Sequence, residues 1–145
     1  MKYLHLVAFV VILANPLPSN ALNKSTEQAI KEVALDYAEG WYAGDPERMA
    51  RALHSKLAKR ALLPTKDNKY RLDDIGKETL VERTRNGGGK NVPKERRRTE
   101  VIIYDVVGNA AVVKLTMHDW VDFLQLIKED GQWKIINVLW ELNSE

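Results

Sequence analysis

The sequence predicts an α+β protein in which helices come first and a curved antiparallel sheet follows. The first half of the chain carries apolar residues at helical spacing. Its C-terminal third, residues 98–142, is rich in β-branched and aromatic residues and is divided by tight turns. The 145 residues show no internal repeat and suit a single domain. Helices followed by a meander of strands are typical of one helical layer packed on one sheet.

Composition excludes several kinds of site. The chain is 45% apolar and 29% charged, with a net charge of +2 that is too small to indicate nucleic-acid binding. It has no cysteine, which rules out disulfides, thiol nucleophiles and thiolate metal sites. Its three histidines lack companions at metal-ligand spacing. Gly87-Gly88-Gly89 has neither the preceding strand nor the following capped helix of a phosphate loop, so we expect no metal and no cofactor.

Residues 1–21 have the pattern of a secretory signal peptide. Lys2 precedes the apolar run Tyr3–Ala14, and small residues follow at Ser19-Asn20-Ala21. The run of about a dozen residues is shorter than the ~20 that a membrane-spanning helix needs. We therefore expect a mature domain of residues 22–145, periplasmic or secreted, with no stable membrane association after cleavage. A retained membrane anchor is the alternative.

The first helix is predicted to begin at Ser25 as N-cap, with Gln28 three residues later completing a capping box. It ends at Gly44, because glycine adopts the left-handed conformation at a helix C-terminus without strain. One side of this helix would cover the sheet and carry aromatic groups that pack in the core or form a pocket wall. The apolar residues at helical spacing are Ile30, Val33, Ala34, Tyr37, Ala38, Trp41 and Tyr42.

A second helix begins at Asp45-Pro46, with Asp as N-cap and Pro at the first helical position. Ser55 is expected to cap a further short helical turn over Lys56–Arg60. This would place His54 at a helix junction, where it caps the helix or contacts a ligand.

A short hairpin and a third helix follow. Residues 61–64 and 70–75 are predicted strands around a polar turn, and residues 77–86 are predicted helix. Lys90–Arg98 is a basic stretch without an interleaved aromatic residue. It is interpreted as a solvated loop and not as a nucleic-acid platform.

Three turns divide the C-terminal sheet: Gly108-Asn109, His118-Asp119 and Asp130-Gly131. Strict alternation from these turns places one largely apolar set on a core face, with Asp122 and Asn137 as its polar members. That set is Ile102, Tyr104, Val106, Val113, Leu115, Met117, Trp120, Asp122, Leu124, Leu126, Trp133, Ile135, Asn137 and Leu139. The opposite face, which includes Val112, Phe123 and Trp140, is also apolar enough to predict a partner subunit.

Two stretches carry a family resemblance. They are Tyr37-Ala38-Glu39-Gly40-Trp41-Tyr42-Ala43-Gly44-Asp45 with Leu53-His54 and Ala58-Lys59-Arg60, and Trp120–Leu126 with Asp130–Ile135. They resemble the Putative lumazine-binding family of the SnoaL-like, nuclear-transport-factor-2-like superfamily. The resemblance implies a cone-shaped α+β barrel whose three N-terminal helices cover the concave face of the sheet. It also implies a pocket between the long helix and the sheet, and homodimers formed through the outer sheet face.

These residues favour a noncatalytic protein that binds a small hydrophobic or aromatic ligand. The predicted ligand-binding residues are Tyr37, Trp41, His54, Tyr104, Leu115, Trp120, Leu124, Asn137 and Leu139, with Asp122 at the pocket floor. The alternative is an isomerase or dehydratase with Asp122 as general base and Asn137 or Tyr104 stabilising an enolate-like oxygen. The last strand has Asn137 and Leu139 where enzymatic relatives often place His or Asp. A third hypothesis is an interaction module that acts through its outer sheet face.

Overall fold

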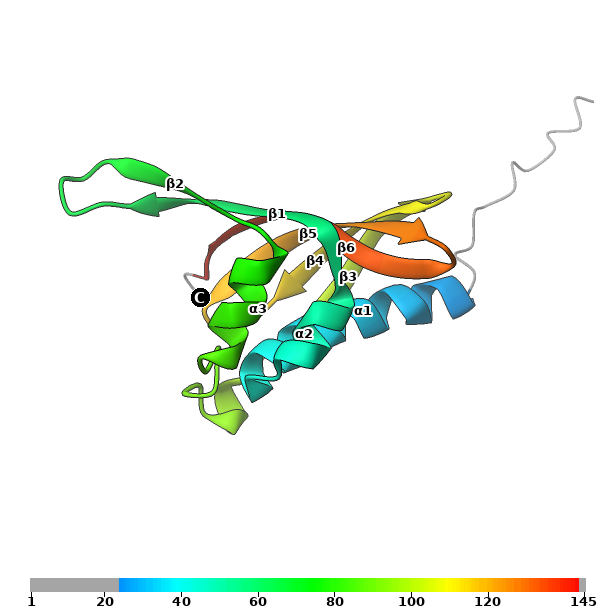
Figure 1. Cartoon of the computed structure of the whole chain (residues 1–145), viewed down its shortest axis with the longest axis horizontal. Helices are drawn as coiled ribbons and strands as arrows, with labels where there is room; N and C mark the ends of the chain where they lie inside the picture. The colour runs from blue at the N-terminus through cyan, green and yellow to red at the C-terminus, as the bar shows by residue number, and fades with distance from the viewer. Residues whose placement is uncertain (1–23, 144–145) are drawn as a thin grey trace, which may run out of the picture.

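The computed structural model describes residues 24–143, and the predicted signal peptide lies outside the described residues. Three helices lie on one side of a curved sheet, and the β1–β2 hairpin extends beyond them (Figure 1). No helix between residues 24 and 143 combines the length and apolar character needed to cross a membrane. The elements are α1 Lys24–Ala43, α2 Pro46–Ala52, β1 Leu53–Pro64, β2 Tyr70–Ile75, α3 Lys77–Arg85, a 3-10 turn Lys94–Arg96, β3 Glu100–Val107, β4 Ala110–Thr116, β5 Trp120–Glu129 and β6 Gln132–Leu142.

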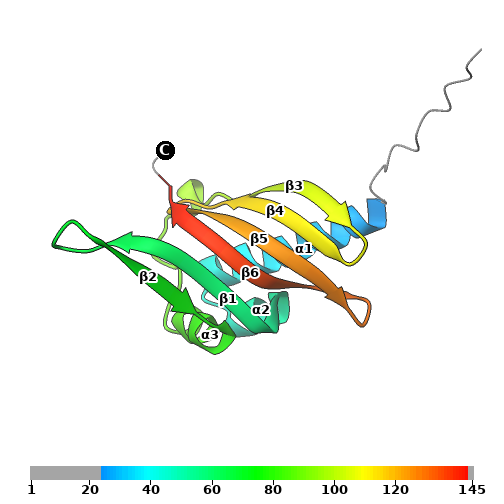
Figure 2. The same cartoon turned by 90° about the horizontal axis from the view of Figure 1, so that it is seen from above.

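The sheet has six strands in the order β2-β1-β6-β5-β4-β3 (Figure 2). The predicted fold class is confirmed, although the sheet is mixed, because β1 runs parallel to β6 while the other neighbouring strands are antiparallel. All three predicted turns join the strands as expected, with Val107 opposite Ala110 and Glu129 opposite Gln132. At the middle turn, the Met117 N–H donates to the Trp120 carbonyl over 2.8 Å.

The second helix begins as its sequence predicts, whereas α1 begins at Lys24, one residue before the predicted N-cap Ser25. The Asp45 carboxylate accepts from the backbone N–H groups of Glu47 and Arg48 at 3.0 and 2.9 Å, which caps α2. Gly40 lets α1 and α2 come close together, because a Cβ there would lie 3.0 Å from the Met49 backbone nitrogen.

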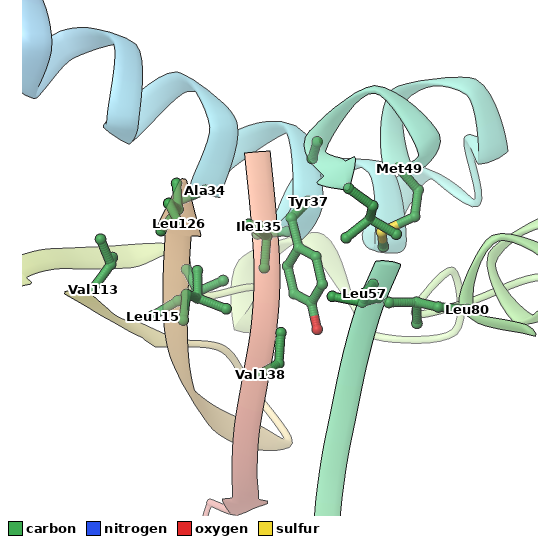
Figure 3. Close-up of a cluster of buried hydrophobic side chains, with 14 of the residues drawn as sticks. Ala34, Tyr37, Met49, Leu57, Leu80, Val113, Leu115, Leu126, Ile135 and Val138 are labelled. Carbon is green, nitrogen blue, oxygen red and sulfur yellow. The ribbon is translucent and has the colours of Figure 1, made fainter. Parts of the chain in front are cut away.

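The core lies between α1 and the concave face of the sheet. Figure 3 shows Ala34 and Tyr37 of α1 directed toward side chains of β4, β5 and β6. Burying these aliphatic and aromatic side chains is the main stabilising contribution to the fold. The largest side chains that are fully buried include Ile30, Met49, Leu53, Leu115, Met117, Leu124, Leu126 and Ile135.

The prediction of a helical turn over Lys56–Arg60 is wrong, because these residues belong to β1. Leu57, Lys59 and Ala61 are buried, while Lys56 and Arg60 are exposed. This alternation has the two-residue period of a strand. Pairing with β2 on one side and β6 on the other provides hydrogen bonds that outweigh the local capping signal.

The predicted facing of β3 and β6 is wrong over part of each strand, because a bulge interrupts each pairing. In β3 the register shifts between Ile103 and Asp105. In the β5–β6 pairing, Gln125 pairs with Asn137 and Leu126 with Ile135, so β6 has one extra residue between them. A bulge adds one residue to a strand and so reverses the facing of the residues beyond it. Val101 and Ile103 therefore pack against the core, as do Val138 and Trp140 in β6.

Candidate functional site

A cavity of about 90 Å³ lies between the helices α1 and α3 and the strands β1, β2, β5 and β6. Its walls are mostly aromatic and aliphatic, and two cationic side chains contribute to them. This composition is typical of a small-molecule site, in which apolar walls surround a few polar groups. The lining residues are Tyr37, Trp41, Lys59, Ile75, Leu80, Arg83, Trp120 and Trp140.

Three tryptophans from three elements form a continuous aromatic wall. Trp41 of α1 and Trp120 of β5 meet edge to face, with ring centroids 5.6 Å apart. Trp120 and Trp140 of β6 repeat that arrangement at 5.7 Å. Edge-to-face contacts between aromatic rings are favourable, so the three indoles support one another as one wall of the cavity.

Lys59 and Asp122 form a buried ion pair beside this wall. The Lys59 Nζ lies 2.5 Å from Asp122 Oδ1, and the two side chains are 8% and 0% exposed. Lys59 is in register with Val138 of β6, and Asp122 lies on β5, so the lysine side chain crosses β6. Such a pair persists in an apolar interior only because each charge has its partner.

The rings of Tyr37 and Trp140 surround the lysine amine. Its nitrogen lies 4.9 Å from the Trp140 ring centroid and 5.6 Å from that of Tyr37, within cation–π range. The Tyr37 hydroxyl donates to Asp122 Oδ1 over 3.3 Å. In Figure 3 the Tyr37 ring extends from α1 into the space between β6 and β1. Asp122 thus receives a second donor from a different element.

Burial shifts the pKa of two members of this cluster. Desolvation lowers the pKa of Lys59, an effect that the attraction of Asp122 opposes. Desolvation also raises the pKa of Tyr37 well above its ordinary value, and the neighbouring Asp122 charge adds to the rise. Tyr37 is therefore a neutral hydrogen-bond donor throughout the physiological pH range.

Arg83 of α3 provides the second cationic group of the cavity. Its side chain is 49% exposed, and its Nη1 lies 3.5 Å from Asp73 Oδ2. Arg71 lies 3.6 Å from the other oxygen of the same carboxylate. One Asp73 carboxylate thus faces two guanidinium groups, so this cluster has a net positive charge. That charge can attract a polar group on a ligand.

The glycine turn after α3 fixes the position of Trp41. The Gly89 N–H donates to the Trp41 carbonyl over 2.9 Å. A Cβ on Gly88 would lie 2.4 Å from the Trp41 carbonyl oxygen, and one on Gly89 would lie 2.7 Å from Trp41 Cδ1. Only residues without a side chain permit this close approach, so the glycines support one wall of the cavity.

Three of the predicted ligand-binding residues, Tyr37, Trp41 and Trp120, line the cavity. Leu115 and Leu124 are fully buried in the core and are not cavity-lining residues. Asp122 is buried at the inner end of Lys59 and does not itself line the cavity.

Three predicted pocket residues, Tyr104, Asn137 and Leu139, lie on the outer face because of the two bulges. Tyr104 and Leu139 are 56% and 62% exposed, and the Asn137 amide donates to Gln125 over 3.0 Å. The expectation that they line the inner cavity is wrong.

His54 contacts a carboxylate away from the cavity. Its Nε2 lies 3.1 Å from Glu129 Oε2, and its Nδ1 accepts from the Lys56 backbone N–H over 3.0 Å. These contacts join the start of β1 to the end of β5, which gives His54 a bridging position in the fold.

The sequence predictions do not include Lys59, Arg83 and Trp140 among the cavity residues. The predicted helical turn hides Lys59, although the alternation of Leu57, Lys59 and Ala61 indicates a strand with a lysine on its inner face. Strict alternation places Trp140 on the outer face, because a bulge in β6 has no distinct sequence signal. Arg83 is one of several basic residues in α3, and nothing in its spacing distinguishes it.

Between residues 24 and 143, no three His, Asp or Glu side chains group closely enough to hold a metal ion.

Comparison with solved structures shows that this chain has the fold of nuclear-transport-factor-2-like proteins. It is similar to an NTF2-like protein of unknown function from Shewanella baltica OS155, with a TM-score of 0.63, 24% identity, and 83% and 96% of the two chains covered. An NTF2-like protein of unknown function from Methylobacillus flagellatus KT is also similar, with a TM-score of 0.60 and 22% identity. The match covers 86% of this chain and 97% of that protein. A protein with a cystatin-like fold from Nostoc punctiforme PCC 73102 gives a TM-score of 0.60 at 17% identity. That match covers 86% of this chain and 96% of the other.

A comparison of the sequence with protein families shows the family. Residues 25–141 match the family described as Putative lumazine-binding, and the chain belongs to that family. The matched residues include both stretches that carry the resemblance. No curated protein sequence matches this chain significantly. Because a fold hosts many unrelated functions, the function has to be argued from the residues of the cavity.

Proposed function

We propose that this protein binds a small, planar aromatic compound in the cavity beside Lys59. The observation that carries the proposal is the wall of Trp41, Trp120 and Trp140 next to a buried amine. Ring faces bind flat apolar molecules, and a positioned polar group selects among them.

The size and charge of the cavity restrict the range of ligands that fit it. About 90 Å³ is less than a typical drug-sized pocket of roughly 300–1,000 Å³, which favours a compound with one ring or part of a larger molecule. Lys59 and Arg83 both donate hydrogen bonds, so an oxygen acceptor on the ligand would complement them. A purely hydrocarbon ligand would leave these donors unused.

Binding is favoured over the isomerase or dehydratase hypothesis by the position of Asp122. A general base must come within hydrogen-bond reach of the proton that it removes. Lys59 lies 2.5 Å from Asp122 Oδ1 and is itself a cavity-lining residue, whereas Asp122 is not. The carboxylate is thus engaged by the protein's own cation.

Export and self-association complete the proposal. The sequence of residues 1–21 supports export to the periplasm or the medium. Exposed Val112, Phe123 and Leu139 on the outer sheet face support a homodimer.

Small-molecule mass spectrometry of the purified protein tests binding without assuming a ligand. We expect an aromatic compound to co-purify with the native protein and to be lost from Trp120→Ala. Tyr104→Ala is the matched control, because it removes an exposed aromatic ring outside the cavity. Equal retention of the compound by the two folded variants would place its site elsewhere and contradict the proposal.

A further inference from the structure

We infer that the Lys59 amine is a nucleophile that condenses with a small aromatic aldehyde or ketone held in the cavity, forming an imine. The inference deepens the proposed function and rests on it, because the carbonyl compound must first occupy the same cavity. It names a class of ligand and a covalent site that binding alone does not require.

The amine is positioned at the cavity and away from bulk water. Its nitrogen lies between the rings of Trp140 and Tyr37, both of which line the cavity, at 4.9 and 5.6 Å from their centroids. Its side chain is 8% exposed, whereas most lysines extend into solvent. A carbonyl group that enters the cavity beside Trp140 would therefore lie next to this amine.

The titratable groups around Lys59 come from four elements. Asp122 of β5 and Asp73 of β2 attract its ammonium form, Arg83 of α3 repels it, and Tyr37 of α1 is neutral. Desolvation exceeds the attraction and lowers the pKa of Lys59. A lysine desolvated in an apolar pocket has more of the neutral, nucleophilic amine than an exposed lysine.

Asp122 is in position to move the proton that condensation requires. The Lys59 ammonium gives one proton to Asp122 Oδ1, 2.5 Å away, and the freed lone pair forms a bond to the carbonyl carbon. The nitrogen then loses a second proton to the carbonyl oxygen. Once its carbon is bonded to the Lys59 nitrogen, that oxygen is one carbon away from the atom that Asp122 contacts, so Asp122 returns the first proton to it without lining the cavity. Water leaves, the C–O bond is broken, and a protonated imine remains paired with the Asp122 carboxylate. Atoms and charge balance without an oxidant or reductant.

Reductive trapping with benzaldehyde and sodium cyanoborohydride tests this inference at neutral pH. The reagent converts an imine into a stable secondary amine, so peptide mass spectrometry locates each benzyl group. Lys56 is the internal reference, because it lies on the same strand and is exposed. We expect roughly tenfold more label on Lys59 than on Lys56 at early times. Lys59→Arg should remove that label, and Lys56→Arg should leave it unchanged.

Benzyl alcohol separates the inference from the function on which it rests. It has the same ring without a carbonyl, and its occupancy of the cavity is measured by tryptophan fluorescence. We expect it to reduce labelling of Lys59 and not of Lys56. If benzyl alcohol binds but Lys59 is labelled no faster than Lys56, the inference is overturned and the binding function stands. If neither compound changes the fluorescence and Lys59 is unlabelled, both are overturned.

Discussion

At the scale of single residues, the ion pair of Lys59 and Asp122 links the stability of the fold to the chemistry of the cavity. Each side chain is almost fully buried, and each provides the charge that the other needs. Removing one partner leaves an uncompensated charge in an apolar interior, whereas removing both removes the desolvation cost as well.

A double-mutant cycle measures this dependence. We expect Asp122→Leu alone to lower the free energy of unfolding by about 3–5 kcal/mol, because it leaves the Lys59 ammonium unpaired. Adding Lys59→Met should recover most of that loss, since the double variant buries no charge. Chemical denaturation of the four proteins provides the values. Strictly additive losses would show that the two side chains do not act as a pair.

The raised pKa of Tyr37 predicts a pH dependence of stability. The unfolded tyrosine ionises near pH 10.0, whereas the buried one stays protonated to higher pH. Its contribution is therefore fully present below pH 10.0 and declines as the pH rises toward the folded-state pKa.

Tyr37→Phe isolates this contribution. We expect the variant to be about 1 kcal/mol less stable than the native protein at pH 8, through loss of the hydrogen bond to Asp122. This difference should shrink above pH 10, as measured by denaturation at several pH values. A difference that grows with pH would contradict the sign of the shift.

At the scale of elements, the two bulges decide which side chains reach the cavity. The predicted turns and the inward position of Asp122 are correct, because β5 alternates without interruption between Trp120 and Leu126. In β6, the added residue brings Trp140 inward and turns Asn137 and Leu139 outward. A bulge changes strand facing without a characteristic residue type, so counting from the turns could not reveal it.

The glycine turn beside α1 also shapes the cavity at this scale. Gly89→Ala should lower the free energy of unfolding by about 1–3 kcal/mol, because its Cβ would collide with the Trp41 ring. It should also change the tryptophan fluorescence spectrum of the folded protein. Gly76→Ala is the control, because a Cβ there makes only ordinary contacts at 3.7 Å or more. Similar effects of the two substitutions would mean that Gly89 does not position Trp41.

At the scale of the whole molecule, the sheet has two apolar faces with different roles. The concave face packs against the helices, and its apolar side chains form the core. The outer face leaves Val112, Phe123 and Leu139 partly or largely exposed around a shallow groove. The order of helices and strands was predictable from hydrophobic periodicity, whereas the parallel pairing of β1 with β6 depends on contacts distant in sequence.

The exposed outer face predicts self-association. We expect the native protein to form dimers in light scattering and Phe123→Lys to form monomers, because a charge at the centre of an apolar interface is costly to desolvate. Tyr70→Lys is the control, since Tyr70 is exposed on the β1–β2 hairpin outside this face. A native protein that is monomeric at every concentration would contradict the proposed dimer.

The most direct test of a ligand site in the cavity uses the four tryptophans as position-specific probes. Trp41, Trp120 and Trp140 line the cavity, while Trp133 is buried in the core. Indole N–H signals in ¹⁵N NMR spectra, assigned by single Trp→Phe variants, would be followed as benzyl alcohol is added. Ligand binding in the cavity predicts that the three lining indoles shift together and that Trp133 stays unchanged. Unchanged lining indoles, or a shift confined to Trp133, would contradict a ligand site between the first helix and the sheet.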